Sequence, residues 1–239
     1  YLEKTLKETK DQYQTRLVII DGVYSQDGDL SLLPEIISLC KTHEAMLMLD
    51  DAHGIGVMGA NGRGTAEHFN CLGQVDIITG TFSKSFGCVG GFAAASKKII
   101  QYLKFYADSN VFSAAPTPQV TASILKALEI IKKEPAIRAR LWENTDYLRS
   151  RLTTEGFDIG KSVSPIFPIM IRDNKKVYEI AKMLQEKGIF TIGIVYPAVR
   201  TKEARLRVSV LATHEHEQLD ALINALNDIN KDIKIKKEQ

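Results

Sequence analysis

The sequence is poor in the residues that build disulfide frameworks and metal sites. Its three cysteines, Cys40, Cys71 and Cys88, are odd in number and widely spaced. This pattern argues against a disulfide framework and against a Cys-X-X-Cys metal site. His214 and His216 have no cysteine or third histidine near them in sequence, so we do not expect zinc there either. We predict buried thiols and no metal.

The chain also lacks an excess of charge of either sign and lacks a long apolar run. It has 31 basic and 29 acidic residues, a formal net charge of +2. So small a charge does not indicate a nucleic-acid partner. No apolar stretch reaches the length of a membrane span and no signal peptide is found, so we expect a cytoplasmic protein. A composition of 44% hydrophobic and 25% charged residues is ordinary for a globular protein of one or two domains.

One lysine stands out because it follows an apolar run directly. Residues 75–78, Val-Asp-Ile-Ile, predict a strand, and residues 79–87, Thr-Gly-Thr-Phe-Ser-Lys-Ser-Phe-Gly, follow it as a loop. We expect Phe82 and Phe86 to enclose Lys84, and a partly desolvated lysine loses its proton more easily than a surface one. Such a lysine can form a Schiff base. The alternative is an ordinary loop lysine.

A second apolar run ends in two carboxylates. Residues 46–49 predict a strand, which is followed by Asp50, Asp51 and, shortly after, His53. Ligands of open α/β sheets bind outside the carboxyl ends of the strands, so both strand ends are expected to face one pocket. This combination fits pyridoxal 5'-phosphate (PLP). A lysine such as Lys84 holds this cofactor as an imine, and a carboxylate keeps its pyridine nitrogen protonated.

The order of the elements predicts an α/β fold. Short apolar strands alternate with helical patterns, at residues 16–21, 46–50, 75–79 and 90–95. This alternation favours a mostly parallel sheet with covering helices. Residues 54–59 also match the Gly-X-Gly-X-X-Gly pattern of dinucleotide folds, but no long helix pattern follows them, so we interpret them as a loop.

The last third of the chain alternates differently and predicts a small α+β domain. We place the domain boundary near Gly156, giving domains of residues 1–155 and 156–239. In the strand expected at residues 205–211, the period of two puts Arg205 and Arg207 on one face. Arg207 could therefore point at a ligand, although exposed strand arginines are commoner.

Taken together, the ordered motifs resemble the α-oxoamine synthases, a group of fold-type I PLP-dependent enzymes. The resemblance covers nearly all 239 residues, through VIIDGVYSQDGD (18–29), LDDAHGIGVMGANGRGT (49–65), GTFSKSFG (80–87), NVFSAAPTP (110–118) and EARLR (203–207). It implies a fold-type I transferase with an incomplete PLP-binding large domain and a small C-terminal domain. Members of the group have a long segment upstream of the position that matches Tyr1, so the chain resembles an N-terminally truncated member.

The resemblance also implies roles for residues around the cofactor. Lys84 resembles the Schiff-base lysine and Asp50 the partner of the pyridine nitrogen. His53 resembles the histidine near the phenolic oxygen of the cofactor. Thr81 resembles the hydroxyl that binds the phosphate, and Ser25 resembles the serine beside the ring.

Two further roles concern the substrate and a second subunit. Arg207 resembles the arginine that takes the amino-acid carboxylate, a role suited to a planar fork of donors. Ser113 resembles a hydroxyl that reaches the cofactor phosphate of the neighbouring subunit, which implies a homodimer with shared active sites. Ala114 and Ala115 depart from the pattern, because many members carry hydroxyl residues at both positions.

The resemblance implies an acyltransferase that condenses a small amino acid with an acyl-CoA and loses carbon dioxide. Serine with a long-chain acyl-CoA, as in serine palmitoyltransferase, is our first hypothesis. The alternatives are glycine, as in 2-amino-3-ketobutyrate CoA ligase, and alanine, as in 8-amino-7-oxononanoate synthase. An ordinary aminotransferase of the same fold is a further enzyme hypothesis. An inactive fragment or a dimerisation module is the hypothesis from another class.

Overall fold

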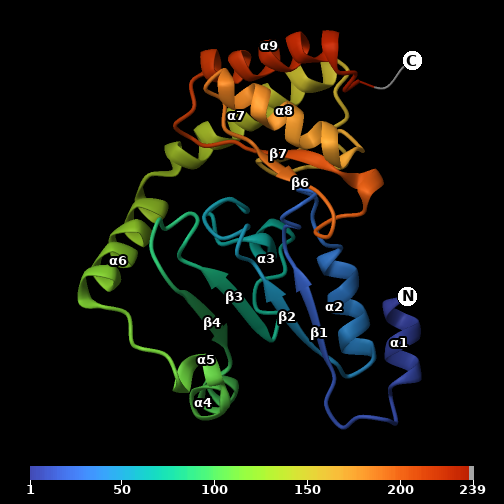
Figure 1. The fold of residues 1–239 in the computed structure, drawn as a ribbon. Coiled ribbons are helices and arrows are strands. Elements are labelled where there is room, and N and C mark those ends of the chain that lie inside the picture. Colours follow the sequence, from blue (N-terminus) through green and yellow to red (C-terminus); the bar gives the residue numbers. More distant parts are fainter. Residues whose placement is uncertain (237–239) are drawn as a thin grey trace. The chain divides into compact units, whose positions relative to one another are not determined.

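The computed structural model describes residues 1–236, which form two compact units (Figure 1). The first unit holds residues 1–23 and 30–135, and the second holds residues 24–29 and the chain from Ala136 onward. Each unit has its own sheet and its own apolar core. The domain boundary expected between residues 155 and 156 stays a prediction, and residues 237–239 of that second domain lie outside the described residues.

The first unit is built on a four-stranded sheet in the order β1-β2-β3-β4. Its strands are β1 (Leu17–Asp21), β2 (Met46–Asp50), β3 (Ile77–Thr81) and β4 (Gly91–Ala95). The first three strands run parallel, and β4 runs antiparallel to β3. Their register pairs Asp21 with Asp50 and Asp50 with Thr79, so the carboxyl ends of three neighbouring strands are aligned. The mostly parallel sheet predicted from the sequence is confirmed.

Helix α2 (Leu33–Thr42) connects β1 to β2 and covers the sheet. Pro34 lies in its first turn, where the missing N–H of proline costs nothing and the fixed φ suits the helix. The apolar core cluster of this unit comes from α2, β2 and the chain after β2, and its buried members are Leu33, Ile37, Cys40, Leu47, Leu49, Ala66 and Cys71. Two of the three cysteines are therefore buried thiols, as expected, whereas Cys88 is only partly buried.

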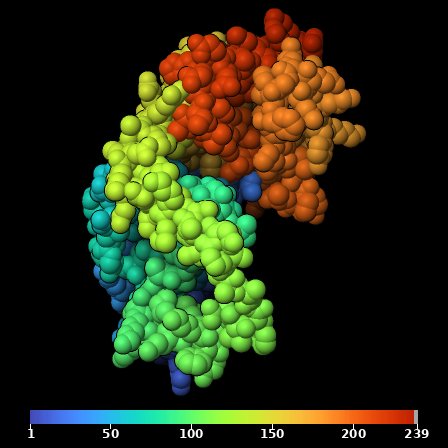
Figure 2. Space-filling view, turned by 90° about the vertical axis from the view of Figure 1, so that its left-hand side faces the viewer, coloured from blue at the N-terminus to red at the C-terminus, as the bar shows by residue number. Residues whose placement is uncertain are grey.

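The other helices of the first unit are α1 (Leu2–Glu8), α3 (Thr65–His68), α4 (Lys97–Tyr106), α5 (Asp108–Val111) and α6 (Pro118–Lys133). They bury few residues: Leu6 in α1, and Thr65 and Ala66 in α3. None of the residues of α4, α5 or α6 is buried, and Phe105 and Phe112 are largely exposed. Figure 2 shows α4, α5 and α6, coloured green to yellow-green, on the molecular surface that faces the viewer.

The second unit has a three-stranded antiparallel sheet in the order β5-β7-β6. The strands are β5 (Ile166–Met170), β6 (Ile192–Ile194) and β7 (Arg205–Ser209), with the short 3-10 helix η1 (Thr201–Glu203) before β7. Helices α7 (Pro135–Thr154), α8 (Asn174–Glu186) and α9 (His216–Asp232) complete it. Apolar side chains from β5, β7 and all three helices form one core, and Phe167, Ile169 and Leu206 are fully buried within it.

Local signals explain where the helices of the second unit begin. The Asp173 carboxylate accepts hydrogen bonds from the backbone N–H groups of Lys175 and Lys176 at the start of α8 (2.8 and 3.1 Å). Glu215 and Gln218 form a reciprocal capping box at the start of α9. Among residues 1–236, no helix combines the length and the apolar character that a membrane crossing needs.

Candidate active site

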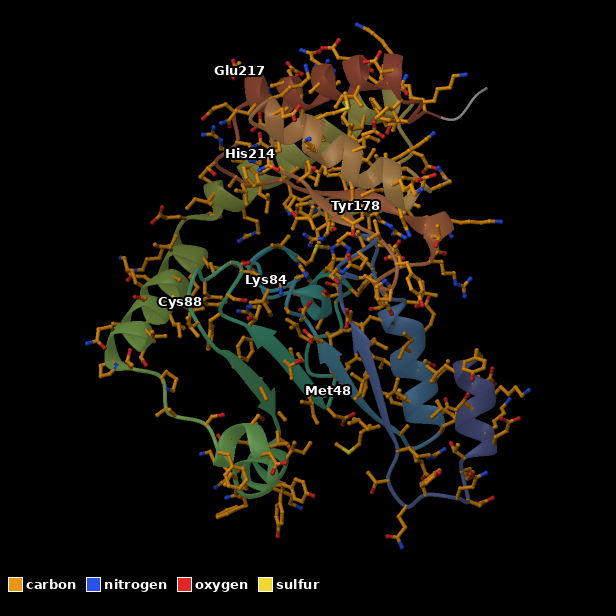
Figure 3. The ribbon with its side chains drawn as sticks, viewed as in Figure 1. Met48, Lys84, Cys88, Tyr178, His214 and Glu217 are labelled. Carbon is orange, nitrogen blue, oxygen red and sulfur yellow. The ribbon has the colours of Figure 1, made fainter. Side chains whose placement is uncertain are left out.

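Lys84 lies just beyond the end of β3 (Figure 3), and β3 pairs with β2, the strand that ends in Asp50. Strand β3 ends at Thr81, and Lys84 follows in the loop that leads to β4. This loop is closed by backbone hydrogen bonds between Phe82 and Gly90 (2.9 Å), Cys88 and Phe82 (2.6 Å), and Gly87 and Lys84 (3.0 Å). These hydrogen bonds hold the backbone of Lys84 at a fixed position beyond the end of β3.

The Lys84 side chain is exposed, so the expectation that two phenylalanines enclose it is wrong. Phe82 packs edge-to-face on Phe86 (5.3 Å between ring centroids) and also contacts the ring of Phe92 (5.5 Å). The rings therefore pack on one another, and Lys84 is exposed. An exposed amine is accessible to a ligand that approaches the end of β3.

Residues with hydroxyl groups flank Lys84 in the chain. The hydroxyl groups of Thr81 and Ser83 lie 2.8 Å apart, and Thr81 Oγ1 also accepts the backbone N–H of Ser83 (3.1 Å). Ser85 donates its hydroxyl to the carbonyl oxygen of Ile55 (2.7 Å), which ties the lysine loop to the loop after β2. A hydroxyl group can donate as well as accept, so the Thr81 and Ser83 pair offers a donor for an anionic oxygen.

The two aspartates after β2 have different environments. Asp51 is fully buried, and its carboxylate accepts the backbone N–H (2.7 Å) and the hydroxyl (2.5 Å) of Thr65. Burial raises the pKa of Asp51, and the two hydrogen bonds from Thr65 oppose that shift. Asp50 is half-buried, and its Oδ1 accepts the N–H of Ala52 (3.0 Å). The Asp51 carboxylate is therefore used inside the protein, and Asp50 is the carboxylate that a ligand can contact.

The glycines after β2 are explained by this buried carboxylate. A Cβ atom at Gly54 would lie 1.9 Å from Asp51 Oδ1, and one at Gly64 would lie 1.8 Å from Asp51 Oδ2. Gly64 also has a φ of +95°, a backbone conformation that other residues rarely adopt. These glycines let the backbone wrap the Asp51 carboxylate, which supports the interpretation of this segment as a loop and not as a dinucleotide motif.

Asp21 is a member of this group of charges that the sequence analysis missed. It ends β1 and is the Cα partner of Asp50 on β2. Burial and then the negative charge of Asp50 raise the pKa of Asp21, while the positive charge of Lys84 lowers it. Asp21 therefore lies close enough to Asp50 and Lys84 for the charges of both to act on its carboxylate. The available signal was that the predicted strand at residues 16–21 also ends in an aspartate.

The other predicted site residues of the first unit lie on two segments. His53 is half-buried in the turn directly after β2, near Asp50 in the chain. Ser113 is exposed after α5, and its hydroxyl donates to the carbonyl oxygen of Ser109 (2.5 Å). The structure thus brings Asp50, Lys84 and Thr81 to adjacent strand ends and leaves Ser113 on the α5–α6 connection.

Ser25 and Arg207 belong to the second unit and contact each other. Arg207, on β7, donates from Nε to the carbonyl oxygen of Ser25 (2.6 Å) and from Nη1 to the hydroxyl of Ser209 (3.0 Å). Burial lowers the pKa of the Arg207 guanidinium from its usual value, and it still stays protonated at neutral pH. One edge of the guanidinium is thus held by the protein, and Nη2 has no hydrogen bond among the described residues.

Comparisons with known proteins give a consistent result. Residues 1–226 match the family Aminotransferase class I and II. The 8-amino-7-oxononanoate synthase of Thermoanaerobacter pseudethanolicus is 42% identical over 234 residues, which are 98% of this chain and 59% of that protein. The serine palmitoyltransferase of Sphingobacterium spiritivorum is 44% identical over 220 residues, 92% of this chain and 55% of that protein.

A solved structure agrees with the sequence matches. A serine palmitoyltransferase from S. paucimobilis, with a bound PLP–myriocin aldimine, superposes with a TM-score of 0.92 and 29% identity. The superposition covers 98% of this chain and 59% of that one. The chain therefore spans little more than half the length of the relatives that it matches.

Proposed function

Because this chain belongs to the aminotransferase class I and II family and, within it, to the α-oxoamine synthases, we propose that it condenses a small amino acid with an acyl-CoA and releases carbon dioxide. The observation that carries the proposal is the pairing of strand ends in the first unit. Lys84 follows β3, and Asp50 ends the neighbouring strand β2. An amine and a carboxylate at adjacent strand ends are what this chemistry requires.

The cofactor of the family is PLP, and the residues present in the first unit fit it. Lys84 offers an exposed amine for covalent attachment to the cofactor aldehyde. Asp50 offers a half-buried carboxylate for the pyridine nitrogen, and Thr81 offers a hydroxyl for the phosphate. When bound, PLP supplies an electron sink that stabilises negative charge on the α-carbon of the amino acid. His53 is proposed to bind the phenolic oxygen, and Ser25 to lie beside the ring.

The proposed roles in the reaction belong to three side chains. The guanidinium of Arg207 binds the carboxylate of the amino acid and orients it. The amine of Lys84 takes the α-proton as a general base. Asp50 keeps a positive charge on the cofactor nitrogen and so favours loss of that proton. The α-carbon then forms a bond to the thioester carbonyl, CoA leaves with the sulfur, and the bond to the carboxylate breaks to release carbon dioxide.

Serine with a long-chain acyl-CoA is our proposed substrate pair. Residues 125–131 and 141–147 resemble bacterial serine palmitoyltransferases, whereas residues 73–81 resemble the glycine-using CoA ligases and residues 52–54 the alanine-using synthases. Identities of 42% and 44% to an 8-amino-7-oxononanoate synthase and a serine palmitoyltransferase do not separate the two activities. Alanine, as in the first of these, and glycine, as in 2-amino-3-ketobutyrate CoA ligase, are the alternatives.

A coupled assay tests this proposal. The protein that carries this chain, supplied with PLP, is given serine, glycine or alanine together with a short or a long acyl-CoA. We expect free CoA and carbon dioxide in equal amounts, only when both substrates are present, and fastest with serine and the long-chain donor. Amino-group transfer without release of CoA would instead indicate an aminotransferase. No turnover of any pair by the protein would favour the inactive fragment or dimerisation module.

We also propose that the active protein is a two-fold homodimer in which Ser113 reaches the cofactor phosphate in the partner subunit. The segment around it is exposed, and Phe112 is 83% exposed. A two-fold interface presents the same patch from both subunits, so each copy would complete the site of the other. The alternative is a connecting loop without a partner.

Mixed dimers test the shared site. Chains with Lys84→Ala and chains with Ser113→Trp are each expected to be inactive, because each lacks one component of every site. After mixing and subunit exchange, hybrid dimers should regain activity in one of their two sites. Ser123 is exposed on α6, and Ser123→Trp serves as the matched control. This variant should be active without mixing. A mixture that never exceeds the sum of its parts would reject the shared site.

A further inference from the structure

Residues 24–29 belong to the second unit, although the chain on both sides of them belongs to the first. They form a closed turn, in which Tyr24 N–H donates to the Asp29 carbonyl (3.0 Å) and Gly28 N–H donates to the Tyr24 carbonyl (2.8 Å). Val163 N–H donates to the Gly28 carbonyl (3.1 Å) and attaches the turn to the chain before β5. A Cβ at Gly28 would lie 2.3 Å from the Ile166 carbonyl oxygen, so the turn packs tightly there.

Arg205 is the most deeply buried charged side chain in contact with this turn. Only 3% of it is exposed, although it lies at the start of β7. Its Nη1 forms an ion pair with Asp27 and donates to the Gln26 carbonyl (3.2 Å). Its Nε donates to the Glu203 carbonyl (2.6 Å). A buried guanidinium is stable only with such partners, and the turn supplies both the opposite charge and a carbonyl oxygen.

Arg207 binds the same turn at the carbonyl oxygen of the residue before Gln26. It follows Arg205 by two residues on β7, so the two side chains leave the same face of the strand. Arg207 Nε donates to the Ser25 carbonyl (2.6 Å), next to the Gln26 carbonyl that Arg205 binds. The two arginines thus bind consecutive carbonyl oxygens of one turn. The sequence indicated the shared face but gave no sign of this common target.

We propose that Arg205 and Asp27 form a clamp that holds the 24–29 turn on β7 and so orients both Ser25 and the guanidinium of Arg207. Arg205 is then a positioning residue, since its own donors are directed at the turn and at Glu203. The consequence for chemistry rests on the proposed function. If Arg207 binds the amino-acid carboxylate, a turn that is not anchored would let the Arg207 guanidinium rotate. The two parallel hydrogen bonds from the guanidinium to the substrate carboxylate would then be lost.

Hydrogen exchange tests the clamp in the chain itself. A cavity of about 420 Å³ is lined by Gln26, Asp27, Arg205, Glu203 and residues 196–200, so water can reach the turn once it loosens. In Arg205→Met and in Asp27→Asn, we expect the amides of residues 24–29 to exchange about tenfold faster or more. The amides that pair β5 with β7 should stay as slow as in the unchanged chain. Lys202→Met, an exposed neighbour, is the matched control and should change neither.

The outcomes separate a clamp from a general packing role. Unchanged exchange of the turn in both variants would overturn the proposal. If Arg205→Met loosens the whole second unit, Asp27→Asn decides, because the Asp27 side chain is 55% exposed and its replacement leaves the core intact. Faster exchange confined to the turn in that variant supports the clamp, and exchange like that of the unchanged chain refutes it.

A kinetic measurement tests the consequence for the substrate. In the PLP-loaded protein, Arg205→Met should raise KM for the amino acid about tenfold while covalent attachment of PLP at Lys84 is unchanged. Arg205→Lys keeps the positive charge but not the planar guanidinium, so its KM should lie between those of Arg205→Met and the unchanged protein. An unaltered KM in a variant whose turn exchanges faster would contradict the link to Arg207. If the unchanged protein shows no condensation activity, the proposed function fails while the exchange experiment still decides the clamp.

Discussion

Replacing Lys84 by alanine will abolish the covalent attachment of PLP to this protein. Lys84 lies beyond the end of β3, with Asp50 at the end of the adjacent strand, and its amine is exposed to a ligand. Alanine removes the only atom that can bond to the cofactor aldehyde at this position. The unchanged protein, mixed with excess PLP, should be yellow and should lose its visible absorbance band on treatment with borohydride. The variant should show only the weak background band that surface amines give.

A second lysine separates this effect from non-specific labelling. Lys98 is exposed in α4 and has no place in the proposed site, so Lys98→Ala should keep the full absorbance band. PLP reacts slowly with many surface amines, and the control shows how little of the band one such amine contributes. A band of equal strength in Lys84→Ala and in the unchanged protein would refute the assignment.

Replacing Asp50 by asparagine should lower turnover by about a hundredfold or more, the scale seen when one preorganised electrostatic contact is lost. Asparagine keeps the shape of the side chain and removes the charge that holds the pyridine nitrogen protonated. Less negative charge can then be accommodated when the α-proton leaves. Attachment of PLP to Lys84 should continue, since it does not depend on that charge. Parallel absorbance and turnover measurements on one preparation check both statements.

Asp76 provides the matched control for this charge. Its carboxylate accepts the N–H of Leu47 (2.8 Å) near the start of β2, whereas Asp50 is at the other end of the strand. Asp76→Asn should therefore leave turnover close to that of the unchanged protein. Near-normal turnover in Asp50→Asn would mean that Asp50 does not carry the proposed role. Asp51 is a poor substitute, because its carboxylate is buried and bound to Thr65.

The strands and the position of Lys84 could be predicted because they depend on local pattern. Short aliphatic runs that end in polar residues indicate parallel strands, and the runs before Asp50 and Thr81 form β2 and β3. The ordered motifs around Asp50 and Lys84 made it possible to predict the family as well. The roles of these residues, and those of His53 and Ser113, remain predictions.

Features that depend on strand register or on distant contacts could not be predicted from local pattern. The pairing of Asp21 with Asp50 follows from the alignment of β1 with β2, which periodicity does not give. Lys84 is exposed and the nearby phenylalanine rings pack on one another, and both depend on side-chain rotamers that local pattern does not give. The turn around Asp27 joins the second unit through Arg205, which lies 178 residues later in the chain.

The central claim is that PLP bonds to Lys84, and peptide mapping tests it most directly. The protein is incubated with PLP, reduced with borohydride to fix any bound cofactor, digested, and analysed by mass spectrometry. The proposed function predicts the added cofactor mass on the peptide that contains Lys84, at a yield matching the lost absorbance. A fixed cofactor found mainly on another lysine, or on none, would contradict it.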